Sequence, residues 1–125
     1  MIKVLIADDE DRICQLIRAL VDWEAMGLEL VGIAHNGLEA GEMAERLQPD
    51  ILITDIRMPG CSGLDLVRRT KESCENLEIV VISGYAHFEY AQQAMRYGVG
   101  DYLLKPINKK ELTATLDKLK KRICM

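Results

Sequence analysis

The sequence has no hydrophobic run near the ~20 residues that a membrane-spanning helix needs. Its apolar start, residues 1–7, is followed directly by Asp8, Asp9 and Glu10, so it lacks the longer apolar region and the cleavage site of a signal peptide. We therefore expect a cytoplasmic protein that makes no membrane contact. Only four cysteines occur, and none is part of a CxxC pair, which disfavours a zinc site and predicts free thiols.

A surplus of positive charge is also absent. The net charge is -4 at pH 7, which argues against strong non-specific binding of nucleic acid by this chain alone. The chain has 125 residues, of which 49% are hydrophobic and 29% charged. These values are typical of one globular domain with a sizeable core, and no linker, repeat or low-complexity tract indicates a second.

Short apolar runs alternate with longer amphipathic stretches along the whole chain. The runs at 4–7, 28–34, 51–53, 79–82 and 102–104 predict strands, and we expect Gly32 to interrupt the second. Apolar residues at helical spacing predict helices over 13–20, 38–47, 64–73, 88–97 and 112–123, the second ended by Pro49. Continuous apolar strands suit a parallel sheet covered on both faces, so we predict one doubly wound α/β domain over residues 1–125.

Polar side chains stand at the ends of these predicted strands. Asp8, Asp9 and Glu10 follow the first strand, Asp55 ends the third, Ser83 ends the fourth, and Lys105 follows the fifth. Because the carboxyl ends of parallel strands meet at one edge of a sheet, we expect these groups to share a site.

The combination of acids, hydroxyl and lysine favours phosphoryl chemistry. Two carboxylates ~4 Å apart in a partly buried site repel one another by about 4 kcal/mol. A hard divalent cation removes that cost, and a ligand set made only of oxygens favours Mg²⁺. Beside such an ion, Asp55 would act as a nucleophile towards a phosphoryl donor and form an acyl phosphate. Lys105 and the hydroxyl of Ser83 would bind oxygens of the phosphoryl group.

Each group alone has a simpler interpretation, because acids after strands commonly cap helices or form turns. Two other functions also compete. An aspartyl phosphatase of the haloacid-dehalogenase type needs a second acid two residues after the nucleophile, where Arg57 stands. A flavodoxin-like cofactor module needs a phosphate-binding loop after the first strand, where the acids stand. His35 and His87 have no partner at ligand spacing and are expected at the surface, and Trp23 is expected to cover the first helix.

Four segments closely resemble the response-regulator receiver family, and the resemblance covers essentially the whole chain. They are residues 4–10 (VLIADDE), 55–63 (DIRMPGCSG), 81–85 (VISGY) and 101–106 (DYLLKP). The resemblance implies a flavodoxin-like fold with strand order 2-1-3-4-5. It implies that Asp55 is the phosphoacceptor and that Mg²⁺ is held by Asp8, Asp9, Asp55 and the backbone carbonyl of Arg57. It further implies that Ser83 and Tyr102 form a switch pair, that Lys105 contacts phosphate, and that the Lys105–Pro106 bond is cis.

The same resemblance implies a role in two-component signal transduction. A sensor histidine kinase would phosphorylate Asp55, so the domain would be a regulatory phosphoacceptor that assists its own phosphotransfer and dephosphorylation, rather than an enzyme with a separate substrate. Segments 22–23, 83–85, 88–91 and 101–107 resemble the subgroup fused to an AraC-type DNA-binding domain. We therefore expect a transcriptional effector domain that is absent from this chain, and DNA contact only through it.

Two further expectations concern the output. Phosphorylation is expected to tighten a homodimer through the helix at 88–97, the strand at 102–104 and the last helix. Charges that could pair across its two-fold axis are Asp101, Glu111, Lys118, Lys121 and Arg122. Gly84 departs from the alanine usual in the family, which bears on the conformation of its loop. A degenerate receiver that acts only as an interaction module would have lost an acid or the lysine, and none is lost.

Overall fold

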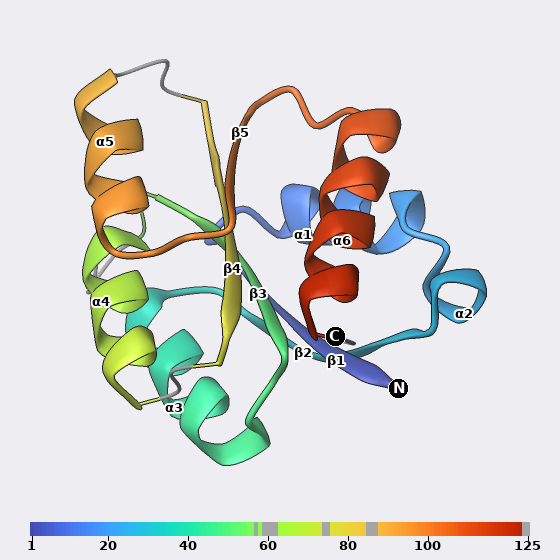
Figure 1. Ribbon diagram of the computed structural model, residues 1–125, viewed down its shortest axis with the longest axis horizontal. Coiled ribbons are helices and arrows are strands. Elements are labelled where there is room, and N and C mark those ends of the chain that lie inside the picture. The colour runs from blue at the N-terminus through green and yellow to red at the C-terminus, as the bar shows by residue number, and fades with distance from the viewer. Residues whose placement is uncertain (57, 59–62, 74–75, 85–87, 124–125) are drawn as a thin grey trace.

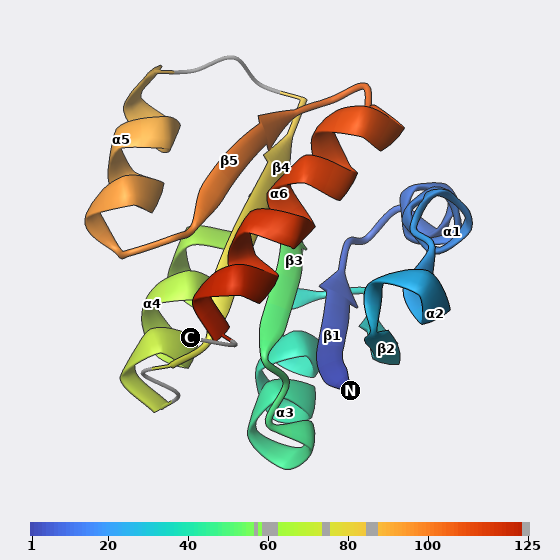
Figure 2. The same cartoon turned by 45° about the vertical axis from the view of Figure 1, so that its right-hand side comes forward.

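The chain folds into a parallel sheet with helices on both of its faces (Figures 1 and 2). The computed structural model describes residues 1–56, 58, 63–73, 76–84 and 88–123. Within them, the strands are β1 (Ile2–Ala7), β2 (Leu28–Ala34), β3 (Ile51–Asp55), β4 (Glu78–Ser83) and β5 (Asp101–Leu104). The helices are α1 (Asp11–Leu20), α2 (Trp23–Met26), α3 (Gly37–Leu47), α4 (Gly63–Ser73), α5 (Phe88–Arg96) and α6 (Lys109–Ile123).

The order of the strands confirms the predicted doubly wound fold. Neighbouring strands run β2-β1-β3-β4-β5, and every pair is parallel. Both views place α3, α4 and α5 on one side of the sheet and α1, α2 and α6 on the other (Figures 1 and 2). From β1 the chain therefore builds the sheet first towards one edge, with β2, and then towards the other, with β3, β4 and β5. The carboxyl ends of β1 and β3 lie next to one another at this switch point.

Alternate residues of each central strand enter two separate cores. Leu5, Leu52 and Val81 belong to the cluster beneath α3, α4 and α5, whereas Val4, Ile53 and Ile82 belong to the cluster beneath α1 and α6. All six side chains are at most 1% exposed. The strands therefore have to be apolar at successive positions, which is why their sequences show no alternation.

Gly32 does not interrupt β2, contrary to the prediction, because the strand runs from Leu28 to Ala34. The irregularity is a shift of register instead: Val4 pairs with Leu30 and Leu5 with Gly32, so Val31 is bypassed. A Cβ at position 32 would collide with Cε of Met43 on α3. Because that atom is the end of a flexible side chain, the glycine leaves room for the Met43 side chain and not for the backbone of α3.

The short helix α2 was not predicted. It contains only Trp23–Met26 and ends at Gly27, whose φ of 70° lies in the left-handed region that terminates helices. One turn is too short to give an apolar period, so only the glycine marks it in the sequence. Trp23 covers the end of α1, as expected, because its Nε1–H donates to the carbonyl of Arg18 over 2.9 Å.

Ion pairs fasten α6 to the sheet. Lys118 Nζ lies 2.9 Å from Asp101 Oδ2, and Arg122 Nη1 lies 3.5 Å from Glu78 Oε2. Thr115 Oγ1 also donates to Asp101 Oδ2, over 3.1 Å. Asp101, Lys118 and Arg122, which were considered above for a dimer interface, therefore have partners within their own chain.

Two expectations from composition can be compared with the described residues. No helix among them has the length and apolarity needed to cross a membrane. Cys14 is a free, buried thiol, and the other three cysteines, Cys61, Cys74 and Cys124, lie outside the described residues.

Candidate functional site

The predicted carboxylates meet at the carboxyl edge of the sheet. Ala7 pairs with Thr54. The residues that follow these two in the chain, Asp8 and Asp55, therefore also lie side by side. One carboxylate oxygen from each of four acids lies within 4.8 Å of the others; the four are Asp8, Asp9, Glu10 and Asp55. Asp8 and Asp55 are buried, at 2% and 6% exposed, whereas Asp9 and Glu10 are exposed. The cluster therefore has an inner pair and an outer pair.

Lys105 brings the only ammonium group that the described residues place within 4 Å of this cluster. Its Nζ lies 3.0 Å from Asp55 Oδ2, 3.5 Å from Asp8 Oδ2 and 3.8 Å from Glu10 Oε1. The backbone of Lys105 is fixed by its N–H, which donates to the carbonyl of Ser83 over 2.8 Å, and its bond to Pro106 is cis. Only 18% of its side chain is exposed, so the ammonium is held against the inner carboxylates.

The electrostatics of the site are set by burial and by these contacts. Burial raises the pKa of Asp8 to about 6, with a further rise from the charge of Asp55, against the hydrogen bond from the Glu10 amide, which lowers it. Burial alone would lower the pKa of Lys105, but the hydrogen bond and charge of Asp55, with the charge of Asp8, outweigh it and raise that pKa. The lysine is therefore firmly cationic, while Asp8 holds a proton more readily than an ordinary carboxyl group.

The donor set fits a hard divalent cation. Among the described residues, its atoms are carboxylate oxygens, which Mg²⁺ prefers, and not the nitrogen and sulfur ligands that favour zinc or copper. Asp8 uses Oδ1 to accept the Glu10 N–H over 2.9 Å, which fixes the orientation of its carboxylate. The backbone carbonyl of Arg57, a further ligand implied by the resemblance, lies outside the described residues.

Ser83 and Tyr102 occupy neighbouring strands next to the cluster. Val81 pairs with Tyr102 and Ser83 with Leu104, so Ser83 and Tyr102 are diagonal neighbours on one face of the sheet. Ser83 is fully buried, and Tyr102 is half-buried against the core under α3, α4 and α5. Among the described residues, the nearest atom to a Cβ at Gly84 would be Cδ of Lys105 at 3.8 Å, which is an ordinary contact.

The remaining candidates lie elsewhere. His35 is exposed and its Nε2 lies 3.2 Å from Asp11 Oδ1, and His87 lies outside the described residues. Sequence reasoning missed the thiol beneath the site: Cys14 Sγ lies 3.5 Å from the carbonyl oxygen of Asp8, and burial raises the pKa of Cys14 to about 11. That thiol contacts the backbone of Asp8, not the carboxylate cluster, and stays protonated at neutral pH.

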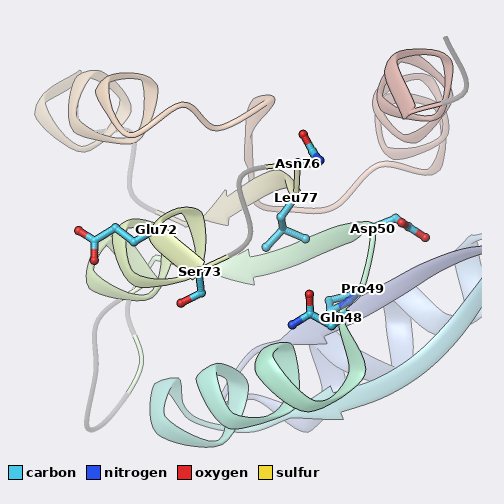
Figure 3. Close-up of a pocket in the computed structure, with 7 residues that line it drawn as sticks. All are labelled: Gln48, Pro49, Asp50, Glu72, Ser73, Asn76 and Leu77. Atoms are coloured by element: carbon cyan, nitrogen blue, oxygen red, sulfur yellow. The ribbon is translucent and has the colours of Figure 1, made fainter.

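A hollow of about 540 Å³ lies at the opposite edge of the sheet (Figure 3). Its residues precede β3 and β4, whereas the acidic cluster follows β1 and ends β3. Asp50, one of its acids, already accepts the Lys3 N–H over 2.8 Å. The hollow therefore takes no part in the chemistry of the cluster.

Known proteins resemble this chain over nearly its full length. A family model described as the response regulator receiver domain matches residues 4–117. The transcriptional regulatory protein YesN of Bacillus subtilis is 42% identical over 119 residues, which cover 95% of this chain and 32% of that protein. The transcriptional regulatory protein HptR of Staphylococcus aureus is 34% identical, with 95% of this chain and 46% of that protein covered.

A solved structure gives the same result for the fold. The REC domain of AraT, a response regulator from Geobacillus stearothermophilus, has a TM-score of 0.92 at 43% identity, covering 97% of this chain and 94% of that chain. The chain thus spans a third to about half the length of the curated relatives given above, but nearly all of this solved domain.

Proposed function

Because this chain belongs to the response regulator receiver domain family, we propose that Asp55 accepts a phosphoryl group from the phosphohistidine of a sensor histidine kinase. The observation that carries the proposal is the position of Asp55. Its carboxylate is buried at the end of β3, 3.0 Å from the ammonium of Lys105 and inside the cluster of acids. The neighbouring acids can hold a cation, and the lysine can bind a phosphoryl oxygen.

The proposed transfer is a displacement at phosphorus. A carboxylate oxygen of Asp55 forms the new bond to phosphorus while the bond from phosphorus to the histidine nitrogen breaks. The bonding electron pair leaves with the imidazole, and because the other ring nitrogen of the phosphohistidine carries a proton in the reacting form, the ring departs neutral. Lys105, now beside Asp55, would move its contact to a phosphoryl oxygen, and the hydroxyl of Ser83 would donate to another.

Asp8 and Asp9 would hold Mg²⁺ together with Asp55. Bound there, the ion would neutralise the negative charge that gathers on the phosphoryl oxygens. Asp8 is buried and fixed by the Glu10 amide, so it is pre-oriented, while the exposed Asp9 is open to a hydrated ion. The same arrangement would assist hydrolysis of the acyl phosphate, so the domain would be a regulatory phosphoacceptor that limits its own activation.

The proposed output is a repacking of the face formed by α5, β5 and α6. Ser83 would follow the phosphoryl group, and Tyr102, its diagonal neighbour, would turn into the space that Ser83 leaves. Large apolar side chains on α5, directly after α5 and on β5 are exposed: Met95 is 59%, Tyr97 37% and Leu104 46% exposed. We infer that this face forms a homodimer when Asp55 is phosphorylated.

The effector that reads this change would be a transcriptional domain. YesN and HptR are transcriptional regulatory proteins, and this chain covers 32% and 46% of them. We propose that the domain works in the cytoplasm, next to the kinase, as the switch of a longer regulator, with DNA contacted only by the attached domain.

Incubation with Mg²⁺ and a small phosphodonor, followed by intact mass, tests the proposal. We expect one added, base-labile phosphoryl group on the parent chain and none on Asp55→Asn. Asp11→Asn is the matched control, since it removes an exposed acid from α1 just outside the cluster and should label like the parent. Equal labelling of Asp55→Asn would refute the assignment, and repeated turnover of donor without a bound phosphoryl group would favour a phosphatase.

A further inference from the structure

We propose that Glu10 is a specificity-determining residue of this site: its exposed carboxylate disfavours phosphoryl donors of high negative charge. The inference rests on the proposed function of Asp55 and concerns which donors reach it.

The position of Glu10 is fixed by its backbone, not by its side chain. Its N–H donates to Asp8 Oδ1 over 2.9 Å, and its carbonyl oxygen accepts the N–H groups of Ile13 and Cys14 at 3.0 and 3.3 Å. Glu10 is the N-cap of α1, but its side chain makes no capping hydrogen bond. The carboxylate is therefore not required to build the helix and faces the site instead, 3.8 Å from Lys105 Nζ.

Glu10 also lies on the solvent-exposed side of the acidic cluster. Its side chain is 53% exposed, while those of Asp8 and Asp55 are 3% and 7% exposed. Among the described acids of the cluster, Asp9 and Glu10 therefore form its solvent-exposed side, and a donor that reaches Asp55 comes into the field of their charges. Asp9 is needed for the cation in the proposed function, which leaves the Glu10 side chain as an outer negative charge, whereas the backbone N–H of Glu10 orients Asp8.

This charge acts on donors in proportion to their own charge. In water, one negative unit charge ~6 Å from a dianionic donor lowers the concentration of that donor at the site by about tenfold at low salt. The reduction is about threefold near 0.15 M salt, where the Debye length is ~8 Å. For a monoanion the low-salt effect is about threefold. A donor with positive charge beside its phosphorus, such as a protonated phosphoimidazole, is penalised least.

The test compares two donors on the parent chain and on Glu10→Gln, at saturating Mg²⁺ and pH 7. At pH 7 acetyl phosphate carries the higher negative charge and phosphoramidate, which is protonated on nitrogen, the lower. In both cases an Asp55 oxygen bonds to phosphorus while the bond from phosphorus to the leaving group breaks, and its electron pair leaves with acetate or with neutral ammonia. We expect Glu10→Gln to accelerate labelling by acetyl phosphate about tenfold at low salt and labelling by phosphoramidate about threefold. Both gains should shrink towards one at ~0.3 M salt.

Three controls separate this role from others. Glu10→Asp keeps the charge and should behave like the parent, and Glu42→Gln removes an exposed charge on α3, outside the cluster, and should change neither rate. Calorimetry with Mg²⁺ alone near 0.15 M salt should give Glu10→Gln an affinity within about threefold of the parent, which is the effect of one unit charge on a divalent ion at that ionic strength. A larger loss would make Glu10 a cation ligand and would overturn the proposal.

The remaining outcomes are equally decisive. Unchanged or slower labelling by acetyl phosphate would overturn the role of Glu10. An equal gain with both donors that ignores salt would assign Glu10 to holding Lys105 and would also overturn donor selection. If the parent chain is not labelled at Asp55 by either donor, it is the proposed function that fails, and the two failures are thus distinguishable.

Discussion

The ammonium of Lys105 donates to Asp55 Oδ2 over 3.0 Å, although the two residues are 50 positions apart in the chain. β3, which ends in Asp55, lies next to β1, while β3 and β4 lie between β1 and β5, yet the acids that follow β1 and Lys105 after β5 reach one edge of the sheet. Lys105 is therefore the counter-ion on which the buried carboxylates depend, and removing it should affect both stability and chemistry.

We predict that Lys105→Met lowers the free energy of unfolding of the metal-free protein by about 1–3 kcal/mol at pH 8, because buried carboxylates lose a charged hydrogen-bond donor. Labelling by phosphodonors should fall at least about tenfold, since the phosphoryl oxygens lose a cationic partner. Urea denaturation in the presence of a chelator measures the first effect. Lys109→Met is the control: its exposed pair with Asp22, at 3.7 Å, should contribute less than about 1 kcal/mol. Equal stability losses in both variants would contradict the role of Lys105.

We predict that Asp9→Asn weakens binding of Mg²⁺ by about tenfold or more, because it removes an exposed carboxylate oxygen from the ligand set. Asp11→Asn removes the same charge from the first turn of α1, where it pairs with His35, and should weaken binding much less. Isothermal calorimetry or amide NMR shifts measure both affinities. Similar small losses in the two variants would mean that net charge, and not a ligand contact, attracts the ion.

We predict that beryllofluoride with Mg²⁺ converts the domain from monomer to dimer at ~10–100 μM, the concentration range of weak association. Met95→Glu should stay monomeric under the same conditions, because it places a charge on the exposed face of α5. Leu38→Glu changes an equally exposed side chain on α3 and should still dimerise. Sedimentation velocity distinguishes these states. A parent chain that remains monomeric, or dimers of both variants, would exclude this face.

We predict that Asp101 stabilises the fold by about 1 kcal/mol at pH 6 and that this contribution disappears in acid. Burial alone would raise the pKa of Asp101, but hydrogen bonds from Lys118, the Tyr102 amide and Thr115 outweigh it and hold that pKa below its usual 3.8. Because the folded-state pKa is depressed, the stabilisation is present above pH ~4 and is lost as pH falls through the lower folded value.

Urea unfolding of the parent and Asp101→Asn at several pH values between 6 and 3 tests this. The stability difference should be constant near neutrality and shrink below pH ~4. Lys118→Met removes the partner at 2.9 Å and should show the same pH dependence. A difference that stays constant down to pH 3 would mean that the carboxylate charge of Asp101 does not contribute.

The positions of the strands and the gathering of Asp8, Asp9, Asp55 and Lys105 could be predicted from the sequence. Each strand is a short apolar run, and parallel strands with helical crossovers leave little choice about which edge receives the residues that follow them. The prediction missed the one-turn helix α2, because four residues are too few to show the helical spacing of apolar residues. It was also wrong at Gly32, where the usual tendency of glycine to interrupt a strand was overridden and β2 continues. A glycine in a strand can mark either a break or a bulge, and only the pairing of β1 with β2, which continues past Gly32 with a shift of register, decides between them.

What the sequence by itself determined is the kind of chemistry available, because side-chain types and their order after each strand are fixed along the chain. What only the tertiary structure decided is how the charges are partnered. Lys118 and Arg122 could have served a second subunit, but they pair with Asp101 and Glu78 of their own chain. Lys105 likewise contacts Glu10 as well as the inner acids. The physical reason is that attraction between charges depends on their separation in space and on burial, and neither quantity is carried by position in the sequence.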